Sequence, residues 1–251
     1  MGSFWKTFFR YLRHMVLPER CPFCGEVMEF GRHCCKRCES QITYFPGDIC
    51  ALCFQRSCIC GHKVPGFHHA FAAFVYDGLA KQSVHMMKFR QGKGNGEHLA
   101  WYLAQVIQRH PEFSKIQGIC FMPMSAKKRR KRGYNQAEVL AKHLSQYLHI
   151  PVYPALKTLR ETQTQHELSA AERKQNLRGA YGFHSDCPPL PETVLLVDDV
   201  ITTGTSMYEG GRVLLSAGAK RVIPAAVCRV KKGIEQADNN FLPNPSVFHE
   251  K

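Results

Sequence analysis

The distribution of cysteine constrains the fold of this chain more than any other feature of its sequence. Nine of its twelve cysteines lie between residues 21 and 60. Six of these nine form Cys-x2-Cys pairs, at Cys21/Cys24, Cys35/Cys38 and Cys50/Cys53. Two thiolates at this spacing can bind one tetrahedral ion from a single tight turn, so the pairs predict zinc. A disulfide framework is the competing interpretation. It is disfavoured because the cluster holds an odd number of cysteines and because we expect no export signal. A reducing cytosol would keep these thiols free.

Two sets of four cysteines can be drawn from this segment. The first set is Cys21, Cys24, Cys35 and Cys38. The second set is Cys50, Cys53, Cys58 and Cys60. In the second set only Ile59 separates the last two cysteines, and His62 or Cys34 is an alternative for one of them. One or two zinc ions with four protein ligands each would be structural, and metal binding would supply most of the folding free energy of a Cys-rich region over residues 21–65.

The ends of the chain differ from its middle. Apolar residues between 4 and 16 recur at helical spacing, which predicts an amphipathic helix within residues 1–20 that docks on its own protein or, alternatively, lies on a membrane surface. No run approaches the ~18 apolar residues of a membrane span. We therefore expect a cytoplasmic protein, with the inner face of the membrane as the alternative location. Residues 233–251 lack periodicity and are expected to be poorly ordered.

Residues 66–232 alternate between strand-like and helix-like patterns. Strands are predicted at 70–76, 116–122, 193–197 and 221–228. Helices are predicted at 80–89, 97–108, 136–148 and 206–216, and the glycine-rich stretch 91–96 is predicted to be a flexible turn. This alternation favours an α/β domain with a mostly parallel sheet flanked by helices, which binds ligands at the carboxyl ends of its strands.

Residues 194–206 carry most of the functional information. A β-branched and aliphatic run ends in two adjacent acids, and a turn rich in hydroxyls and glycine follows. The acids can accept hydrogen bonds from vicinal sugar hydroxyls or hold a divalent cation. Backbone N–H groups at the start of the next helix favour a phosphate, and the Lys of a Walker-type loop is missing after Gly204. The residues predicted to bind a sugar phosphate are Asp198, Asp199, Thr202, Thr203, Gly204, Thr205 and Ser206.

The chain carries a formal net charge of +14, and six consecutive cations contribute to it. They are Lys127, Lys128, Arg129, Arg130, Lys131 and Arg132. A solvated basic face is the simplest interpretation of such a run. Its place between the strand predicted to end near residue 122 and the next helix favours a basic loop at the ligand face instead, where it would bind pyrophosphate or a nucleic-acid backbone.

The segment 194–206 resembles the phosphoribosyl pyrophosphate (PRPP) motif of type I phosphoribosyltransferases. Further motifs resemble the ComF group of competence-associated proteins, which includes ComFC and GntX-like members. In chain order, after the cysteine pairs, they are Phe74-Val75-Tyr76-Asp77-Gly78, Met87-Lys88-Phe89, Arg132-Gly133-Tyr134-Asn135-Gln136-Ala137, Thr164-Gln165, Leu168-Ser169 and Arg173-x2-Asn176-Leu177. The resemblance covers residues 17–229.

This resemblance implies an N-terminal zinc ribbon, a type I phosphoribosyltransferase fold, PRPP bound with Mg²⁺, and a role in taking up single-stranded DNA during natural transformation. It also implies a pyrophosphate loop at residues 124–127, with Arg132 close by. Gln165, Arg173 and Asn176, together with Arg160, would belong to the mobile loop that closes over the reacting centre.

Two functions are compatible with these features. In the first, the chain binds PRPP and single-stranded DNA and works with a helicase-like partner in DNA uptake. In the second, it is an active phosphoribosyltransferase in nucleotide or related metabolism that transfers ribose 5-phosphate to an unidentified acceptor. We favour the first because of the basic charge and the resemblance, although no clear set of stacking aromatics accompanies the basic run.

Overall fold

Four parallel strands form the central sheet of the protein, in the order β1-β6-β5-β2. The computed structural model describes residues 15–88, 93–160 and 177–230. The strands are β1 (Phe71–Val75), β2 (Gly118–Phe121), β5 (Thr193–Ile201) and β6 (Arg221–Arg229). The two central strands, β5 and β6, are buried on both faces, which explains why they read as continuous apolar runs.

The side chains of the sheet alternate between two hydrophobic cores. Leu195 and Val197 of β5 belong to one core, whereas Val194 and Leu196 belong to the other. This is the period-2 alternation of a strand. Because both faces of the sheet are apolar, each must be covered.

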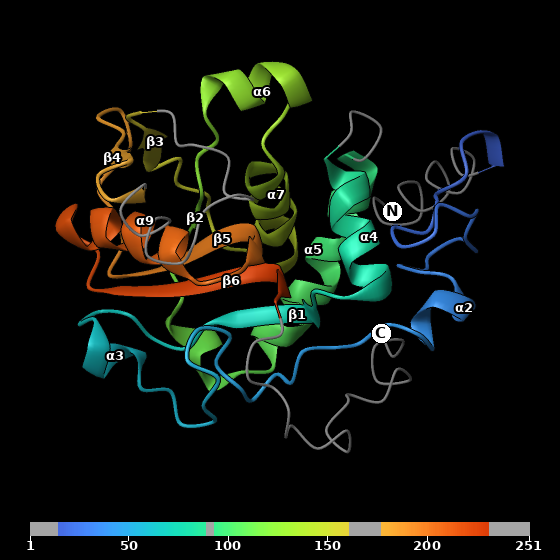
Figure 1. Ribbon diagram of the computed structural model, residues 1–251, viewed down its shortest axis with the longest axis horizontal. Coiled ribbons are helices and arrows are strands. Elements are labelled where there is room, and N and C mark those ends of the chain that lie inside the picture. The colour runs from blue at the N-terminus through green and yellow to red at the C-terminus, as the bar shows by residue number, and fades with distance from the viewer. Residues whose placement is uncertain (1–14, 89–92, 161–176, 231–251) are drawn as a thin grey trace, which may run out of the picture.

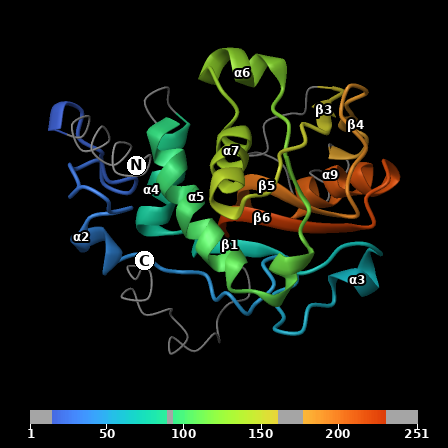
Figure 2. The same ribbon diagram turned by 180° about the vertical axis from the view of Figure 1, so that it is seen from behind.

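Helices cover both faces of the sheet (Figures 1 and 2). One face packs against α4 (Gly78–Met87), α5 (Lys93–Gln108) and α7 (Gln136–Leu148), and the other packs against α9 (Thr205–Ser216). The connection that leads from β2 to β5 runs through α7 on one face of the sheet. The connection that leads from β5 to β6 runs through α9 on the other face. This reversal creates a switch point between β2 and β5, where ligands bind in open α/β sheets.

Shorter elements surround the sheet. A two-stranded antiparallel sheet of β3 (Leu156–Thr158) and β4 (Tyr181–Phe183) lies beside α9. The 3-10 helix η2 (Pro111–Lys115) precedes β2, and α6 (Ala126–Arg132) follows it. Two short helices, α2 (Lys36–Glu39) and α3 (Cys60–Lys63), belong to the cysteine-rich segment.

The cysteine-rich segment covers the sheet edge that β1 would otherwise expose. Tyr44 forms an antiparallel bridge with Phe74, and the Phe45 N–H donates to the carbonyl of Ala73 at 3.0 Å. Val152 covers the opposite edge through a parallel bridge with Ile119 of β2. Covered edges cannot pair with another chain. The division of the chain near residue 65 stays a prediction.

The predicted α/β class is confirmed, and so is helix 136–148. The predicted flexible turn at 91–96 is wrong for residues 93–96, which form the first turn of α5. A Cβ at Gly96 would lie 2.6 Å from Cγ1 of Val139, so glycine allows α5 and α7 to pack closely. The predicted strand 193–197 is too short, because pairing with β6 continues to Ile201.

Some predictions fall on residues outside the described ranges. They include most of the N-terminal helix within 1–20 and the whole of the tail 233–251. Gln165, Arg173 and Asn176 of the expected mobile loop also lie outside the described residues. Within the described residues, the helices are too short or too polar to cross a bilayer.

Candidate functional site

Two adjacent acids lie near the end of β5, where the strand has passed the end of β2. The last paired residue of β2, Phe121, faces Val197, so Asp198 and Asp199 lie beside the chain that leaves β2. The Asp199 N–H donates to Oδ1 of Asp198 at 2.9 Å. Burial, together with the neighbouring charge of Asp199, raises the pKa of Asp198 well above its ordinary value. A cation or a set of hydroxyl donors would stabilise the ionised form of this acid.

The hydroxyl-rich turn connects β5 to α9 and is shaped by one glycine. Gly204 has φ +80°, a left-handed conformation that L side chains rarely adopt, and it directly precedes the first residue of α9. The Oγ1 atoms of Thr203 and Thr205 lie 2.8 Å apart and bond one another. The N-terminus of α9, a helix of three turns, therefore opens next to the twin acids, as a phosphate site requires.

The chain that leaves β2 forms the opposite wall of the site. Asn135 is buried, and its Nδ2 donates to the carbonyl of Met122 at 2.9 Å, while its Oδ1 caps α7 by accepting from the Ala137 N–H at 3.1 Å. The neighbouring Gln136 is also buried and donates to the carbonyl of Met87 at 3.4 Å. The motif at 132–137 thus fixes the turn after β2 relative to both α4 and α7.

These walls enclose a cavity of about 380 Å³ at the switch point. The acids Asp198 and Asp199 line it together with the cations Lys88, Lys128 and Arg132. Its other lining residues are Tyr76, Met122, Pro123, Met124, Ser125, Asn135, Gln136, Ala137, Thr158, Tyr181, Val200, Thr202 and Ser206. Acids at one strand end and cations around them suit a ligand that carries both hydroxyls and anionic groups.

The predicted phosphate-loop residues divide into two groups. Thr202 and Ser206 line the cavity, as does Tyr181. Thr203, Gly204 and Thr205 form the turn between them. Burial raises the pKa of Tyr181 to about 12, so its hydroxyl stays protonated and remains a donor at neutral pH.

The basic run is a helix and not a loop. Ser125 caps α6 by accepting from the Lys128 N–H at 3.4 Å, and Gly133, with φ +83°, ends it. Lys and Arg are good helix formers, and the serine cap with the left-handed glycine defines both ends. Of the six cations only Lys128 and Arg132 line the cavity; the remaining four are exposed.

The first set of cysteines converges on one point. The ligand atoms of Cys21, Cys24, Cys35 and Cys38 all lie within 4.8 Å of one another, with 3.7 Å between the sulfurs of Cys24 and Cys35. Four thiolates at about 2.3 Å from a tetrahedral zinc ion stand about 3.8 Å apart, so this set fits zinc. Cys34 is not part of it, because its sulfur accepts a bond from the Tyr102 hydroxyl at 3.0 Å.

The second set also converges. Sulfur–sulfur distances are 3.4 Å for Cys58 with Cys50, 3.7 Å for Cys50 with Cys60 and 3.8 Å for Cys53 with Cys58. The close spacing of the last two cysteines is accommodated because Cys60 begins α3, and its N–H donates to the Cys58 sulfur at 3.4 Å. The set needs neither of the alternative ligands, Cys34 and His62. Two four-cysteine clusters can therefore hold zinc.

Sequence reasoning missed part of the cavity. Tyr76, Lys88, Thr158 and Tyr181 line it, but they come from separate elements and carry no local pattern of charge or spacing. Tyr76 and Lys88 lie within motifs that carry the family resemblance, which was the only signal that could have indicated them.

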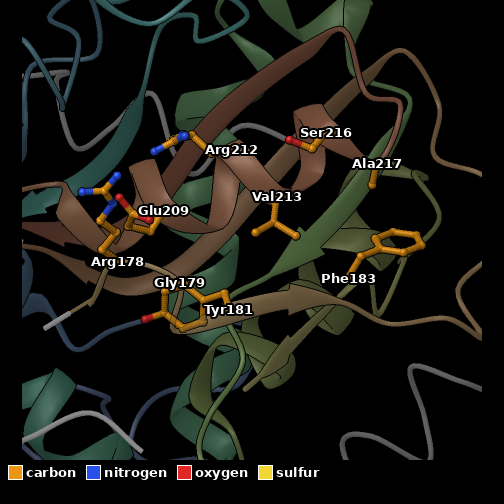
Figure 3. Close-up of a pocket in the computed structure, with 9 residues that line it drawn as sticks. All are labelled: Arg178, Gly179, Tyr181, Phe183, Glu209, Arg212, Val213, Ser216 and Ala217. Carbon is orange, nitrogen blue, oxygen red and sulfur yellow. The ribbon is translucent and has the colours of Figure 1, made fainter. Parts of the chain in front are cut away.

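A second hollow of about 580 Å³ lies between β4 and α9 (Figure 3), and Tyr181 lines both this hollow and the cavity at the twin acids. Arg178, Glu209 and Arg212 gather at one end of it and Phe183 at the other. It is larger than the cavity at the twin acids, but both arginines are exposed and none of the predicted site residues lines it. Polar groups converge at the strand ends, so the smaller cavity is the better candidate.

Comparison with known proteins gives a consistent set of relatives. The model of the phosphoribosyl transferase domain matches residues 135–245. DNA utilization protein YhgH of Escherichia coli K12 is 28% identical over 83% of this chain and 89% of its own length. Competence protein F of Haemophilus influenzae is 28% identical over 81% of this chain and 93% of its own length.

More distant similarities follow. Competence protein ComFC of Bacillus subtilis is 23% identical over 73% of this chain and 78% of its own length. The solved structure of orotate phosphoribosyltransferase from Aeropyrum pernix aligns with 51% of this chain and 55% of its own, at 21% identity and a TM-score of 0.31.

Proposed function

We propose, from the premise that this chain is a homologue of the ComF-type competence proteins and carries a phosphoribosyl transferase domain, that it binds PRPP with Mg²⁺ at the end of β5 and single-stranded DNA on helix α6. In this proposal it acts in DNA uptake during natural competence. The names of its relatives, competence protein F and DNA utilization protein, support that role.

One observation carries the PRPP proposal. The twin acids, the hydroxyls of Thr202 and Ser206, and the cations Lys128 and Arg132 all line a single cavity. PRPP has a diol between a phosphate and a pyrophosphate, and it needs these three kinds of contact in that arrangement. Asp198 and Asp199 would accept from the ribose hydroxyls, and the start of α9 would hold the 5-phosphate.

The pyrophosphate would lie against the turn after β2. Lys128 and Arg132 extend from α6 toward this part of the cavity, and Lys88 approaches it from the end of α4. Mg²⁺ bound with the pyrophosphate would neutralise part of its charge and be held by carboxylate or phosphate oxygens. The buried Asn135 would keep the turn in place through its bond to Met122.

Isothermal calorimetry with PRPP and Mg²⁺ tests the site. Asp198→Asn with Asp199→Asn should reduce the affinity at least tenfold, since an amide cannot replace two charged acceptors. Asp186→Asn is the matched control, because Asp186 is an exposed acid outside the cavity. Wild-type affinity in the double variant would refute the site.

The DNA proposal depends on the outer face of α6. Lys127, Arg130 and Lys131 are exposed and do not line the cavity. Replacing these three by Gln should weaken binding of a labelled oligothymidylate and leave PRPP affinity unchanged. The slope of log DNA affinity against log salt concentration should become less steep by about 2. The helicase-like partner proposed for this pathway would be sought by pull-down only after DNA binding is established.

The second candidate function is an active phosphoribosyltransferase, and one observation favours it. Thr158 lines the cavity, and its buried Oγ1 has no hydrogen-bond partner among the described residues. A buried hydroxyl without a partner is costly unless a ligand satisfies it, and an acceptor molecule is one such ligand. Pyrophosphate release with PRPP and a panel of bases, amines and single-stranded DNA tests this function. Turnover that Thr158→Val abolishes would support the enzyme.

A further inference from the structure

A buried arginine joins the second cysteine centre to the predicted phosphate loop. Arg229 ends β6 and is 4% exposed. Its Nε donates to the carbonyl of Ala51 at 2.5 Å, and Ala51 lies between the ligands Cys50 and Cys53. Its Nη1 donates to the carbonyls of Ile201, at 3.1 Å, and Thr202. One guanidinium group therefore holds the metal knuckle and the first residues of the loop together.

The partners of this arginine are unusual for a buried charge. Within the described residues they are backbone carbonyls and one aromatic ring, with no carboxylate among them. A buried cation needs opposite charge nearby or a complete set of acceptors. Four thiolates around Zn²⁺ carry a net charge of −2, so a metal-loaded second centre would supply that charge.

The knuckle is bent so that a ring lies under the guanidinium. Phe54 has φ +57°, which is rare for a bulky residue, and its N–H donates to the carbonyl of Cys50 at 2.9 Å. The Arg229 guanidinium carbon lies 4.3 Å from the centre of the Phe54 ring. The cysteine ligands on both sides of this turn hold the strained residue in place.

The second centre contacts the loop and the start of α9 at two further points. A Cβ at Gly204 would lie 2.9 Å from Cδ2 of Leu52, so the knuckle packs directly against the glycine of the turn. Tyr208, in the first turn of α9, lies near the Cys60 side chain in the same core. By contrast, the first centre packs in the other core, with residues of α4 and α5.

We propose that Arg229 is a positioning residue that couples the second cysteine centre to the loop 201–206, so that losing metal from this centre lowers phosphate affinity while losing it from the first centre does not. This inference rests on the proposed function, because it takes the loop to hold the 5-phosphate of PRPP. It adds a role for a metal centre that would otherwise be purely structural.

The test uses the full zinc-loaded chain and four variants. Arg229→Lys keeps the charge but loses the planar fork, and Phe54→Leu removes the ring and keeps the arginine. Cys58→Ser affects the second centre, and Cys24→Ser is its matched control at the first, since both sulfurs are partly buried ligands. The readouts are zinc per chain, PRPP affinity by calorimetry, and amide hydrogen exchange in peptides covering 199–208.

Arg229→Lys should lose at least tenfold in PRPP affinity and exchange faster over 199–208 while it keeps its full zinc content. Phe54→Leu should change both readouts in the same direction by a smaller factor, and it serves as the test if the lysine variant does not fold. Cys58→Ser should match Arg229→Lys in PRPP affinity and exchange while it loses zinc from the second centre, and Cys24→Ser should stay within about twofold of wild type in PRPP affinity. Equal loss of affinity at the two centres, or unchanged exchange in both Arg229→Lys and Phe54→Leu, would overturn the proposal.

Failure of the proposed function has a different signature. If the wild type does not bind PRPP but exchange over 199–208 still increases in Arg229→Lys and Cys58→Ser and not in Cys24→Ser, the coupling stands and the ligand is wrong. If the wild type binds PRPP and none of these variants changes exchange or affinity, the ligand stands and the coupling is wrong.

Discussion

The two cysteine centres share a ligand set but occupy different places in the fold. Figure 1 shows α2 of the first centre and α3 of the second toward opposite ends of the sheet. The first centre packs among aromatic rings, with Phe23 5.4 Å from Phe74 in an edge-to-face arrangement. The second packs between the end of β6 and the start of α9. If the proposed coupling holds, the position of a cysteine centre, and not its ligand set, decides whether it can affect the proposed phosphate site.

Removing one ligand from each centre should give the largest effects. Cys21→Ala and Cys50→Ala each delete a fully buried thiolate, and each should cost about 3 kcal/mol or more of unfolding free energy, since structural zinc contributes ~10 kcal/mol or more to folding. Thermal unfolding with and without PRPP and Mg²⁺ measures the difference. PRPP with Mg²⁺ should raise the Tm of Cys21→Ala as it raises that of wild type, and it should leave the Tm of Cys50→Ala unchanged. The same ligand response in both variants would remove the distinction.

Two glycines allow a matched comparison of backbone strain. Gly204 has φ +80° and Gly25, in the first knuckle, has φ +79°, but an added Cβ meets Leu52 only at Gly204. Gly25→Ala should cost about 1 kcal/mol from the left-handed conformation. Gly204→Ala should cost about 2 to 4 kcal/mol, because crowding adds to the strain, and should abolish PRPP binding.

Chemical denaturation measures both costs, and Leu52→Ala should recover part of the stability of Gly204→Ala while leaving Gly25→Ala unchanged. Equal costs at the two glycines would mean that Leu52 does not press on the turn.

Asp198→Asn should stabilise the unliganded protein by about 1 kcal/mol at pH 7 while it weakens PRPP binding, as is common where a functional residue is destabilising. Burial and Asp199 raise the folded-state pKa of Asp198 above its ordinary value of 3.8. Protonation of Asp198 therefore adds to the free energy of unfolding. This contribution is fully present below pH 3.8 and is lost as pH rises through the folded-state pKa of Asp198.

Unfolding measured across pH tests this sign. The difference between Asp198→Asn and wild type should shrink toward zero as the solution is acidified, and the exposed control Asp186→Asn should show no such trend. A variant less stable than wild type at pH 7 would contradict the account of the acid.

The smallest effects should come from two tyrosines, one beside each centre. The Tyr102 hydroxyl donates to the Cys34 sulfur at 3.0 Å beside the first centre, and Tyr208 lies near Cys60 of the second. Tyr102→Phe should cost about 1 kcal/mol of unfolding free energy, because it loses this hydrogen bond. Calorimetry should show a few-fold loss of PRPP affinity for Tyr208→Phe and none for Tyr102→Phe. A loss at Tyr102→Phe would show that both centres reach the site.

The sequence predicted the features that follow from local pattern. Helical spacing located α7, and the apolar run before Asp198 located β5. The helix α6 was missed because the run of cations was not considered together with the serine that caps it. The start of α5 was missed because the glycine at position 96 is explained only by its close contact with Val139, which the sequence does not show. Thr158, Tyr181 and Arg229 could not be predicted. Their roles depend on which elements the sheet brings together.

Calorimetric titration of the zinc-loaded wild type with PRPP and Mg²⁺, repeated in saturating ribose 5-phosphate and then in saturating pyrophosphate, asks whether one cavity holds both ends of this ligand. Each competitor alone should lower the apparent affinity, because each occupies one part of the cavity between β2 and β5. Binding that neither competitor affects, or no binding of PRPP at all, would contradict the assignment.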